Sequence, residues 1–298
     1  MKMAANRRAN LYDAVMPEVL IQMLPQFLAH ASAETRDRSR SVPADAQIEA
    51  TLQPPLQGLA DGKQDSLNGA SAVVIDVLRA STTMIHALAH GATSVLPCLT
   101  VDSAMAAARD LPLEKRLLGG ERHGKLIPGF DLGNSPLDYP PDVVKNKTLI
   151  FTTTNGTRAL LQCRSAVHAY IGAFVNRSAI VTRLAMENRS VHFVCAGTDG
   201  HFTAEDILFA GAAASDLVSA KHSGWTVGNL QAQLAMDYFQ ARSRTSETFR
   251  SAFFQSRGAQ NLLALGMTRD IERAMEMDLF DCVPEWNSQT GLISLGCS

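Results

Sequence analysis

Short apolar runs alternate with amphipathic segments over most of the chain after residue 70. Apolar runs bounded by turn residues are typical of buried strands, and apolar positions three or four residues apart are typical of helices. The expected strands are Val73–Val77, Thr93–Leu99, Thr148–Thr153, Val167–Ile171 and Val191–Cys195. The expected helices are Thr82–His90, a short segment capped by Asp102 or Ser103 that ends near Asp110, Thr157–Gln162, Arg177–Met186 and Ala204–Ala220. This alternation predicts an α/β fold with three layers, in which helices cover both faces of a mainly parallel sheet.

The beginning of the chain follows a different pattern. Val19–Met23 is apolar enough for a first short strand, but residues 32–68 are largely polar and interrupted by proline and glycine. Such a composition predicts a long excursion or a poorly ordered insert. We therefore expect residues 1–69 to be a strand plus an insert, and residues 70–298 to be a single functional unit.

The region after Trp225 is expected to be mostly helical. Leu230, Leu234 and Tyr238 recur at a spacing of four residues, which predicts a helix whose apolar stripe faces the core. Leu292–Leu295 is expected to form a final short strand.

Three of the expected strands run into small polar residues, with glycine or arginine, immediately before a helix. These segments are Val73–Thr83, Leu149–Arg158 and Val191–Gly200. In open α/β sheets, ligands bind at the carboxyl ends of the strands. The free N–H groups and the positive dipole end of a helix N-terminus suit an anion such as phosphate. The pattern therefore indicates a site for a phosphorylated, acidic small molecule.

Asp76 lies inside an apolar strand, where a charge is costly unless it is paired or binds a metal. One interpretation is structural: Asp76 pairs with Arg79 or accepts backbone N–H bonds, and Ser81 caps the helix. The functional interpretation is a strand-end carboxylate that binds Mg²⁺, with Arg79 matched to a phosphate or carboxylate and Thr82 nearby. We favour the functional one, and whether Asp76 also acts as a nucleophile is left open.

A second cluster follows at Gly119–Gly124, which places a carboxylate and a guanidinium, Glu121 and Arg122, between glycines. A plain turn does not require this pair, so we expect Glu121 to bind metal and Arg122 to bind substrate. The neighbouring His123 is expected to be solvent-exposed or to contact residues that bind the ligand, rather than to act as a base.

The loop Thr152–Arg158 offers hydroxyls, an amide and a cation at a helix start. Its Asn155, Gly156, Thr157 and Arg158 are candidate substrate contacts. Nucleotide-binding loops carry G-x-G-x-x-G or a Walker lysine, and this loop has neither.

Glu205 and Asp206 are adjacent carboxylates at the start of the expected helix after Gly200. Thr203 and Asp206 have the spacing of a capping box, which is a structural explanation for both. That explanation does not cover Glu205. The pair would suit Mg²⁺ binding, and Asp206 would orient or deprotonate an attacking water.

Composition narrows the possibilities. The 298 residues carry a net charge of −2, so nothing calls for a nucleic-acid or membrane partner. Five dispersed cysteines without a C-x-x-C pair predict reduced thiols and a cytoplasmic location. A homodimer is expected only because dimers are the commonest oligomers.

The order and residues of these motifs resemble those of the 2-phosphosulfolactate phosphatases. The matching segments are Val74–Thr83, Gly119–Arg122, Gly129–Pro136, Thr152–Arg158, Cys195–Thr198 and Glu205–Asp206. The resemblance continues more weakly through Asn261–Gly266, Asp270–Ile271 and Val283–Pro284. The resemblance implies a Mg²⁺-dependent phosphomonoester hydrolase that acts on 2-phospho-3-sulfolactate, a step toward coenzyme M. It also implies two similar, entwined subdomains. The alternatives are a non-catalytic binding protein for a phosphorylated or sulfonated acid and a nicotinamide-dependent oxidoreductase, which the missing G-x-G-x-x-G disfavours.

These expectations define a candidate site. We expect the metal at Asp76, Glu121, Glu205 and Asp206, and the catalytic groups at Asp76, Arg79, Glu121 and Asp206. We expect the substrate to contact Arg79, Ser81, Thr82, Arg122, Asn155, Gly156, Thr157 and Arg158. Metal and Arg79 would neutralise charge on the phosphoryl oxygens, which is the main task in phosphoryl transfer.

Overall fold

A computed structural model describes residues 46–51, 67–187, 189–220 and 224–296. All of them belong to one compact unit that spans residues 42–298. The strand expected at Val19–Met23 lies outside the described residues. No helix in the described ranges is long and apolar enough to cross a membrane.

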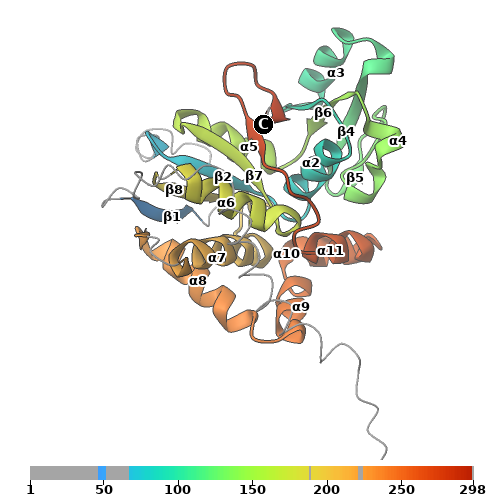
Figure 1. Cartoon of the computed structure of the whole chain (residues 1–298). Helices are drawn as coiled ribbons and strands as arrows, with labels where there is room; N and C mark the ends of the chain where they lie inside the picture. The colour runs from blue at the N-terminus through green and yellow to red at the C-terminus, as the bar shows by residue number, and fades with distance from the viewer. Residues whose placement is uncertain (1–45, 52–66, 188, 221–223, 297–298) are drawn as a thin grey trace, which may run out of the picture. The chain divides into compact units, whose positions relative to one another are not determined.

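The described residues form a sheet of 11 strands in the order β5-β4-β6-β3-β11-β10-β7-β2-β8-β1-β9 (Figure 1). The strands are β1 (Gln47–Thr51), β2 (Ser71–Ile75), β3 (Ser94–Pro97), β4 (Arg116–Arg122), β5 (Lys125–Leu126), β6 (Thr148–Thr152), β7 (His168–Gly172), β8 (Val191–Cys195), β9 (Thr226–Val227), β10 (Pro284–Trp286) and β11 (Ile293–Leu295). The strands expected between Val73 and Cys195 are therefore all present, with ends shifted by at most two residues.

The sheet consists of two parallel arrays. One is β4-β6-β3 and the other is β7-β2-β8-β1-β9. Between them lies the antiparallel hairpin β10-β11, whose Glu285 is opposite Tyr170 of β7 and whose Ile293 is opposite Val95 of β3. The mainly parallel sheet is thus confirmed, whereas the similarity and entwining of two subdomains stay a prediction.

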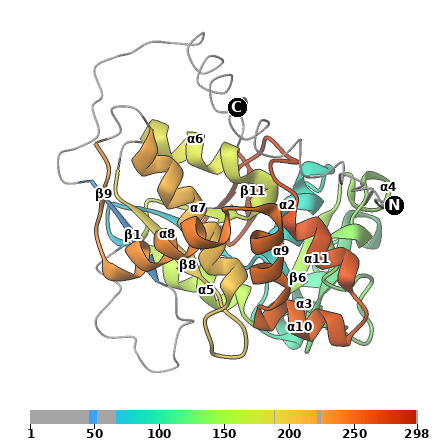
Figure 2. The same cartoon turned by 90° about the horizontal axis from the view of Figure 1, so that it is seen from below.

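The helices are α2 (Ala80–Ala89), α3 (Val101–Arg109), α4 (Pro141–Val144), α5 (Gly156–Gln162), α6 (Arg177–Glu187), α7 (Ala204–Ser219), α8 (Leu230–Arg242), α9 (Ser246–Phe254), α10 (Arg257–Ala264) and α11 (Thr268–Met275). Short 3₁₀ turns occupy Leu113–Lys115, Pro136–Asp138, Cys163–Ser165 and Phe174–Asn176. Figure 2 shows the C-terminal helices α8 to α11 from below the sheet.

Helices cover both faces of the sheet around β2, which is buried along its whole length. Val73 and Ile75 belong to an apolar cluster with α6, α7 and the C-terminal helices. Val74, which points to the opposite face, belongs to a second cluster with α2 and α5. Burial on both faces explains why this strand is a continuous apolar run rather than an alternating one.

Strand β1 corrects one expectation. Residues 32–68 were expected to be a long excursion, but Gln47–Thr51 is a strand that pairs in parallel with β8, with Ile48 opposite Val191. Its apolar residues Ile48 and Ala50 are buried in the same cluster as Val73. Such a short segment between polar residues becomes a strand through its partner, which sequence alone does not reveal. The division at residue 69 stays a prediction.

The apolar stripe of α8 also differs from expectation, because Leu230 and Leu234 are 71% and 51% exposed. The buried face is instead made by Ala232, Ala235 and Met236. It packs on α7, where a Cβ atom on Gly211 would collide with the Ala235 carbonyl. The two backbones approach closely through small residues, so α8 turns its alanines inward and its leucines outward.

Three helix starts differ from expectation. Helix α2 follows Arg79 without a side-chain capping bond, so Ser81 does not cap it. Helix α3 is capped by Thr100, which exchanges hydrogen bonds with Ser103, rather than by Asp102 or Ser103. Helix α7 follows Thr203 as expected, but Thr203 makes no side-chain capping bond. The capping-box explanation for Thr203 and Asp206 is therefore wrong, and Asp206 has other partners described below.

Candidate functional site

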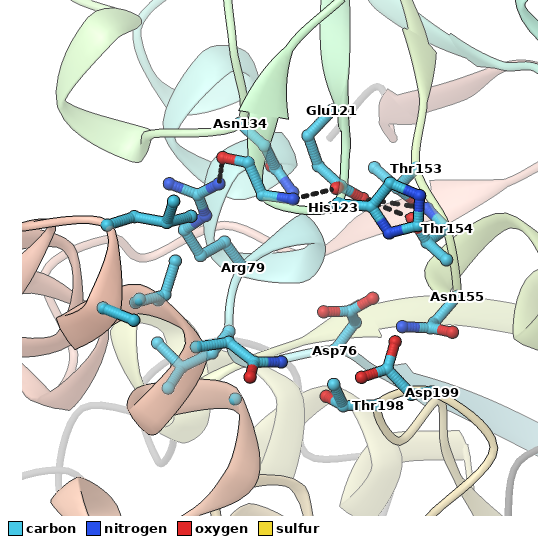
Figure 3. Close-up of a pocket in the computed structure, with 17 residues that line it drawn as sticks. Asp76, Arg79, Glu121, His123, Asn134, Thr153, Thr154, Asn155, Thr198 and Asp199 are labelled. Carbon is cyan, nitrogen blue, oxygen red and sulfur yellow. Dashed lines mark hydrogen bonds between the residues drawn. The ribbon is translucent and has the colours of Figure 1, made fainter.

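A cavity of about 350 Å³ lies at the carboxyl ends of strands from both parallel arrays (Figure 3). Asp76 follows β2, Thr153–Asn155 follow β6, Thr198 and Asp199 follow β8, and Glu121 belongs to β4. One wall comes from α10 and the residues around it, namely Gly258, Asn261, Leu262, Ala264 and Leu265. The structure thus has a cavity where the strand-end loops predict a ligand site.

Asp76 is held at the bottom of this cavity by the turn between β2 and α2. Its Oδ1 accepts the Ala80 N–H at 3.1 Å, and its own N–H donates to Ser81 Oγ at 2.9 Å. The start of α5 lies against Oδ2, because a Cβ atom on Gly156 would be only 2.9 Å from it. Burial, and then the negative charge of Asp206, raise the pKa of Asp76 to about 8. A cation beside Asp76 would counter both effects.

Glu121 joins two loops across the cavity. Its Oε1 accepts hydrogen bonds from the Thr154 N–H at 3.0 Å and the Thr154 hydroxyl at 2.9 Å, and its Oε2 accepts the Gly124 N–H at 2.7 Å. The carboxylate is therefore fixed relative to the β6–α5 loop, and it lines the same cavity as Asp76.

Arg79 also lines the cavity, but it does not pair with Asp76. Its guanidinium forms a 2.6 Å ion pair with Asp270 of α11 and donates to the Gly124 carbonyl at 3.0 Å. The structural interpretation that paired Asp76 with Arg79 is therefore wrong. The backbone contact that it offered for Asp76 is present, through Ala80.

Glu205 and Asp206 lie behind the cavity rather than in its lining. Asp206 accepts the Val77 N–H at 2.9 Å and the Gly197 N–H at 3.0 Å, one with each oxygen, and so ties the ends of β2 and β8 together. Burial, and then the charge of Glu205, raise the pKa of Asp206 to about 8. Burial raises the pKa of Glu205 to about 7. Because Asp206 lies behind the cavity lining, it is not arranged to activate water in the cavity.

Only part of the expected substrate set reaches the cavity. Asn155 lines it. Ser81 and Thr82 are buried and donate their hydroxyls to the carbonyls of Val74 and Val77. Gly156 and Thr157 begin α5 without lining the cavity, although Gly156 borders Asp76.

The two remaining arginines do not line the cavity. Arg122 donates to the Thr152 hydroxyl at 2.9 Å and to the Glu121 carbonyl, and Arg158 is exposed on α5. Neither is brought toward Asp76 in this arrangement.

Several cavity residues were missed. Thr153 and Thr154 lie inside the segment Leu149–Arg158, and Asp199 lies inside Val191–Gly200, but none of the three was a candidate site residue. Asn134 is buried in the lining, and its Oδ1 has no hydrogen-bond partner in the structure. The family resemblance reached the α10 wall only weakly and assigned it no role, because that role depends on the return of a segment more than 100 residues away from β6.

The cavity has the donor set for a hard cation. Among the described residues, no three His, Cys, Asp or Glu converge to form a metal site made by protein alone. Mg²⁺ does not require one, because it is commonly held by one or two carboxylates together with phosphate oxygens and water. Asp76 and Glu121 supply carboxylates to the cavity, as does Asp199, which pairs with Arg257 at 3.3 Å, while the lining residue Arg79 is already paired with Asp270. A phosphate dianion would thus meet more negative than positive charge unless a cation accompanied it.

The family model described as 2-phosphosulpholactate phosphatase matches residues 59–289. The chain belongs to this family. Members of the 2-phosphosulfolactate phosphatase family are phosphoric monoester hydrolases, and the match contains every cavity residue described above.

Similar relatives carry the same description. Proteins named probable 2-phosphosulfolactate phosphatase from Caldanaerobacter subterraneus subsp. tengcongensis and Symbiobacterium thermophilum are 38% and 39% identical to this chain, over 74% of it and 88% and 92% of their own lengths. One from Synechocystis sp. is 41% identical over 72% of this chain and 88% of its own length.

Proposed function

We propose that this chain hydrolyses the phosphate monoester of 2-phosphosulfolactate to sulfolactate and phosphate with the help of Mg²⁺. The family and the names of the relatives support the reaction. The observation that carries the proposal is the cavity itself, where Asp76, Glu121 and Arg79 meet at the carboxyl ends of two parallel arrays. A protein that only bound anions would gain nothing from three carboxylates next to its ligand.

Asp76 and Glu121 would hold the cation, which would supply positive charge to the phosphoryl oxygens and lower the pKa of a bound water. Asp76 would bind the cation through Oδ2, because its Oδ1 already accepts the Ala80 N–H. Glu121 is oriented by Thr154 and Gly124, so the two carboxylates keep their separation when substrate enters. Glu205 and Asp206 would act indirectly, by fixing the backbone that carries Asp76.

The remaining chemistry falls to neutral and charged groups of the lining. Arg79 would bind phosphoryl oxygens with the N–H groups that do not contact Asp270 or the Gly124 carbonyl. The amides of Asn134 and Asn155 and the hydroxyl of Thr153 would orient the acidic arms of the substrate. Asp199, the third carboxylate of the lining, would take the proton of the attacking water in place of Asp206.

The test is phosphate release from 2-phosphosulfolactate with Mg²⁺ and with a chelator. We expect turnover only with Mg²⁺, and we expect Asp76→Asn to lower kcat by at least about 100-fold because a metal ligand and its charge are lost. Asp142→Asn, an exposed carboxylate on α4, is the matched control and should leave kcat unchanged. A folded protein without turnover under any of these conditions would sink the proposal.

A further inference from the structure

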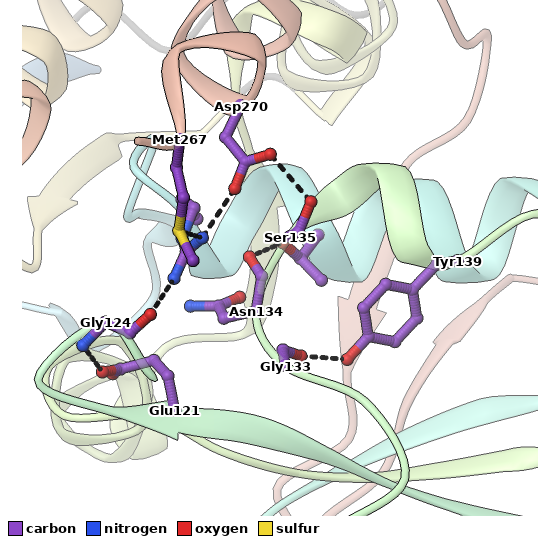
Figure 4. A network of polar contacts seen from close by, with 10 residues as sticks. Glu121, Gly124, Gly133, Asn134, Ser135, Tyr139, Met267 and Asp270 are labelled. Carbon is purple, nitrogen blue, oxygen red and sulfur yellow. Dashed lines mark hydrogen bonds and ion pairs between the residues drawn. The ribbon is translucent and has the colours of Figure 1, made fainter. Parts of the chain in front are cut away.

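Arg79 is anchored at the edge of the cavity by a residue from the far end of the chain. The Arg79 and Asp270 side chains are 3% and 5% exposed, and Nη1 lies 2.6 Å from Asp270 Oδ2. Nη1 also contacts Met267 Sδ at 2.8 Å, and Nη2 donates to the Gly124 carbonyl at 3.0 Å. Three acceptors, on the residues labelled Asp270, Met267 and Gly124 in Figure 4, therefore fix the plane of the guanidinium.

Asp270 is itself held in place. Its second oxygen, Oδ1, accepts the Ser135 hydroxyl at 2.7 Å, and its backbone N–H donates to the Met267 carbonyl at 3.2 Å. Ser135 belongs to the loop that also carries Asn134 of the cavity lining. Asp270 thus joins α11, this loop and the β2–α2 turn (Figure 4).

The anchors leave part of Arg79 unused. A guanidinium has five N–H donors, and the contacts to Asp270, Met267 and Gly124 occupy three of them. Since Arg79 lines the cavity, the donors that remain are available to a ligand there. A fork with two donors matches two oxygens of a phosphoryl group.

We propose that Asp270, held by Ser135, is a positioning residue that orients the Arg79 guanidinium for a phosphoryl group. The inference rests on the proposed function, because it names how one substrate-binding group of that site is aimed. Asp270 does not touch the substrate. It fixes Arg79 from behind, so that ordering this long side chain costs little when substrate binds.

A purely structural role is the competing explanation, and a second, partly exposed ion pair provides the comparison. Arg177 and Asp216 form a bidentate ion pair, with distances of 2.7 Å, that lines no part of the cavity. Asp216→Asn should therefore lower thermal stability without altering the kinetics of the folded enzyme. Asp270→Asn should alter both.

We expect Asp270→Asn to lower kcat/KM for 2-phosphosulfolactate by about 10- to 100-fold. Ser135→Ala, which removes one hydrogen bond and no charge, should cost a smaller factor in the same direction and serves if Asp270→Asn does not fold. Stabilisation of the folded protein by inorganic phosphate with Mg²⁺, measured as a shift in melting temperature, should shrink in both variants. This second readout needs no turnover, so it separates failure of the inference from failure of the proposed reaction.

Chemical rescue gives a readout that a structural role would not affect. Guanidinium ions added to Arg79→Ala should restore part of kcat, because Asp270 still provides their binding place. The double variant Arg79→Ala/Asp270→Ala should show no rescue. Unchanged kcat/KM and unchanged phosphate stabilisation in folded Asp270→Asn, or equal rescue in the single and double variants, would overturn the proposal.

Discussion

Asp76 owes its place to small neighbours as much as to its hydrogen bonds. Ser81 and Ala80 hold its backbone and one oxygen, and Gly156 leaves room for the other. Ala80 and Ser81 follow the β2–α2 turn, and Gly156 follows the β6–α5 turn. The position of the carboxylate therefore depends on how these two turns pack together. A change as small as one methyl group can test this fit.

Gly156→Ala should lower kcat/KM by about tenfold or more, because its Cβ would lie 2.9 Å from Asp76 Oδ2 and 3.1 Å from Ala80 Cβ and would displace the carboxylate. Thermal stability should change little, since alanine favours the helix that begins there. The measurement is steady-state kinetics beside a melting curve. Gly133→Ala, where a Cβ meets no atom within 4 Å, is the control and should match the wild type.

His86 on α2 is a buried base, 3% exposed, with no hydrogen-bond partner for Nε2. Burial, and then the charges of Arg273 and His90, lower its pKa to about 3. The unfolded chain, with an ordinary pKa near 6.5, binds the proton first as pH falls. The free energy of unfolding is therefore unaffected by His86 above about pH 6.5. Between about pH 6.5 and pH 3 it falls by about 1.4 kcal/mol per pH unit as the pH is lowered.

Denaturant unfolding at pH 7 and pH 5.5 measures this loss. His86→Leu should reduce the difference in the free energy of unfolding between pH 7 and pH 5.5 by about 1 kcal/mol. His201→Gln, at an exposed position, should leave the difference as it is in the wild type. An equal pH dependence in all three proteins would show that His86 does not titrate as described.

At the scale of elements, the sequence predicted the strands and the helices that follow them, because continuous apolar runs and helical spacing are local properties. It did not predict which way neighbouring side chains point. Glu121 and Arg122 are adjacent in a strand and therefore face opposite sides, so only Glu121 reaches the cavity. The resemblance reached the α10–α11 wall and Asp270 only weakly and assigned them no role, because that role depends on contacts that exist only in three dimensions.

The α7–α8 contact provides a prediction for packing. In an isolated helix, Gly211→Ala would be stabilising by about 1 kcal/mol. Here the new Cβ would meet the backbone of Ala235 and Met236, so we expect a loss of about 1–3 kcal/mol in the free energy of unfolding. Urea titration measures it, and Ser219→Ala, at the exposed end of α7, is the comparison that should stay near the wild-type value.

At the scale of the molecule, the β10-β11 hairpin joins the two parallel arrays into a single sheet. Ile293 is fully buried in the cluster that contains Val95 of β3 and Leu149 of β6. Because the cavity draws residues from both arrays, the hairpin supports the site without touching it.

Ile293→Ala should destabilise the protein by about 2–4 kcal/mol, because it leaves a void at the junction. Denaturant unfolding checks the value, and Ser294→Ala, whose side chain points to the other face, should cost far less. A loss for Ile293→Ala no greater than that for Ser294→Ala would contradict the role assigned to the hairpin.

The position of this hairpin also bears on biosynthesis. Strands β3 and β7 are made long before β10 and β11 leave the ribosome, so each array ends for a time in an open edge. Unpaired edges of this kind recruit other chains and favour aggregation. The nascent protein is therefore most exposed to misassembly just before residues 284–295 emerge, and a holding chaperone would be most useful during that interval.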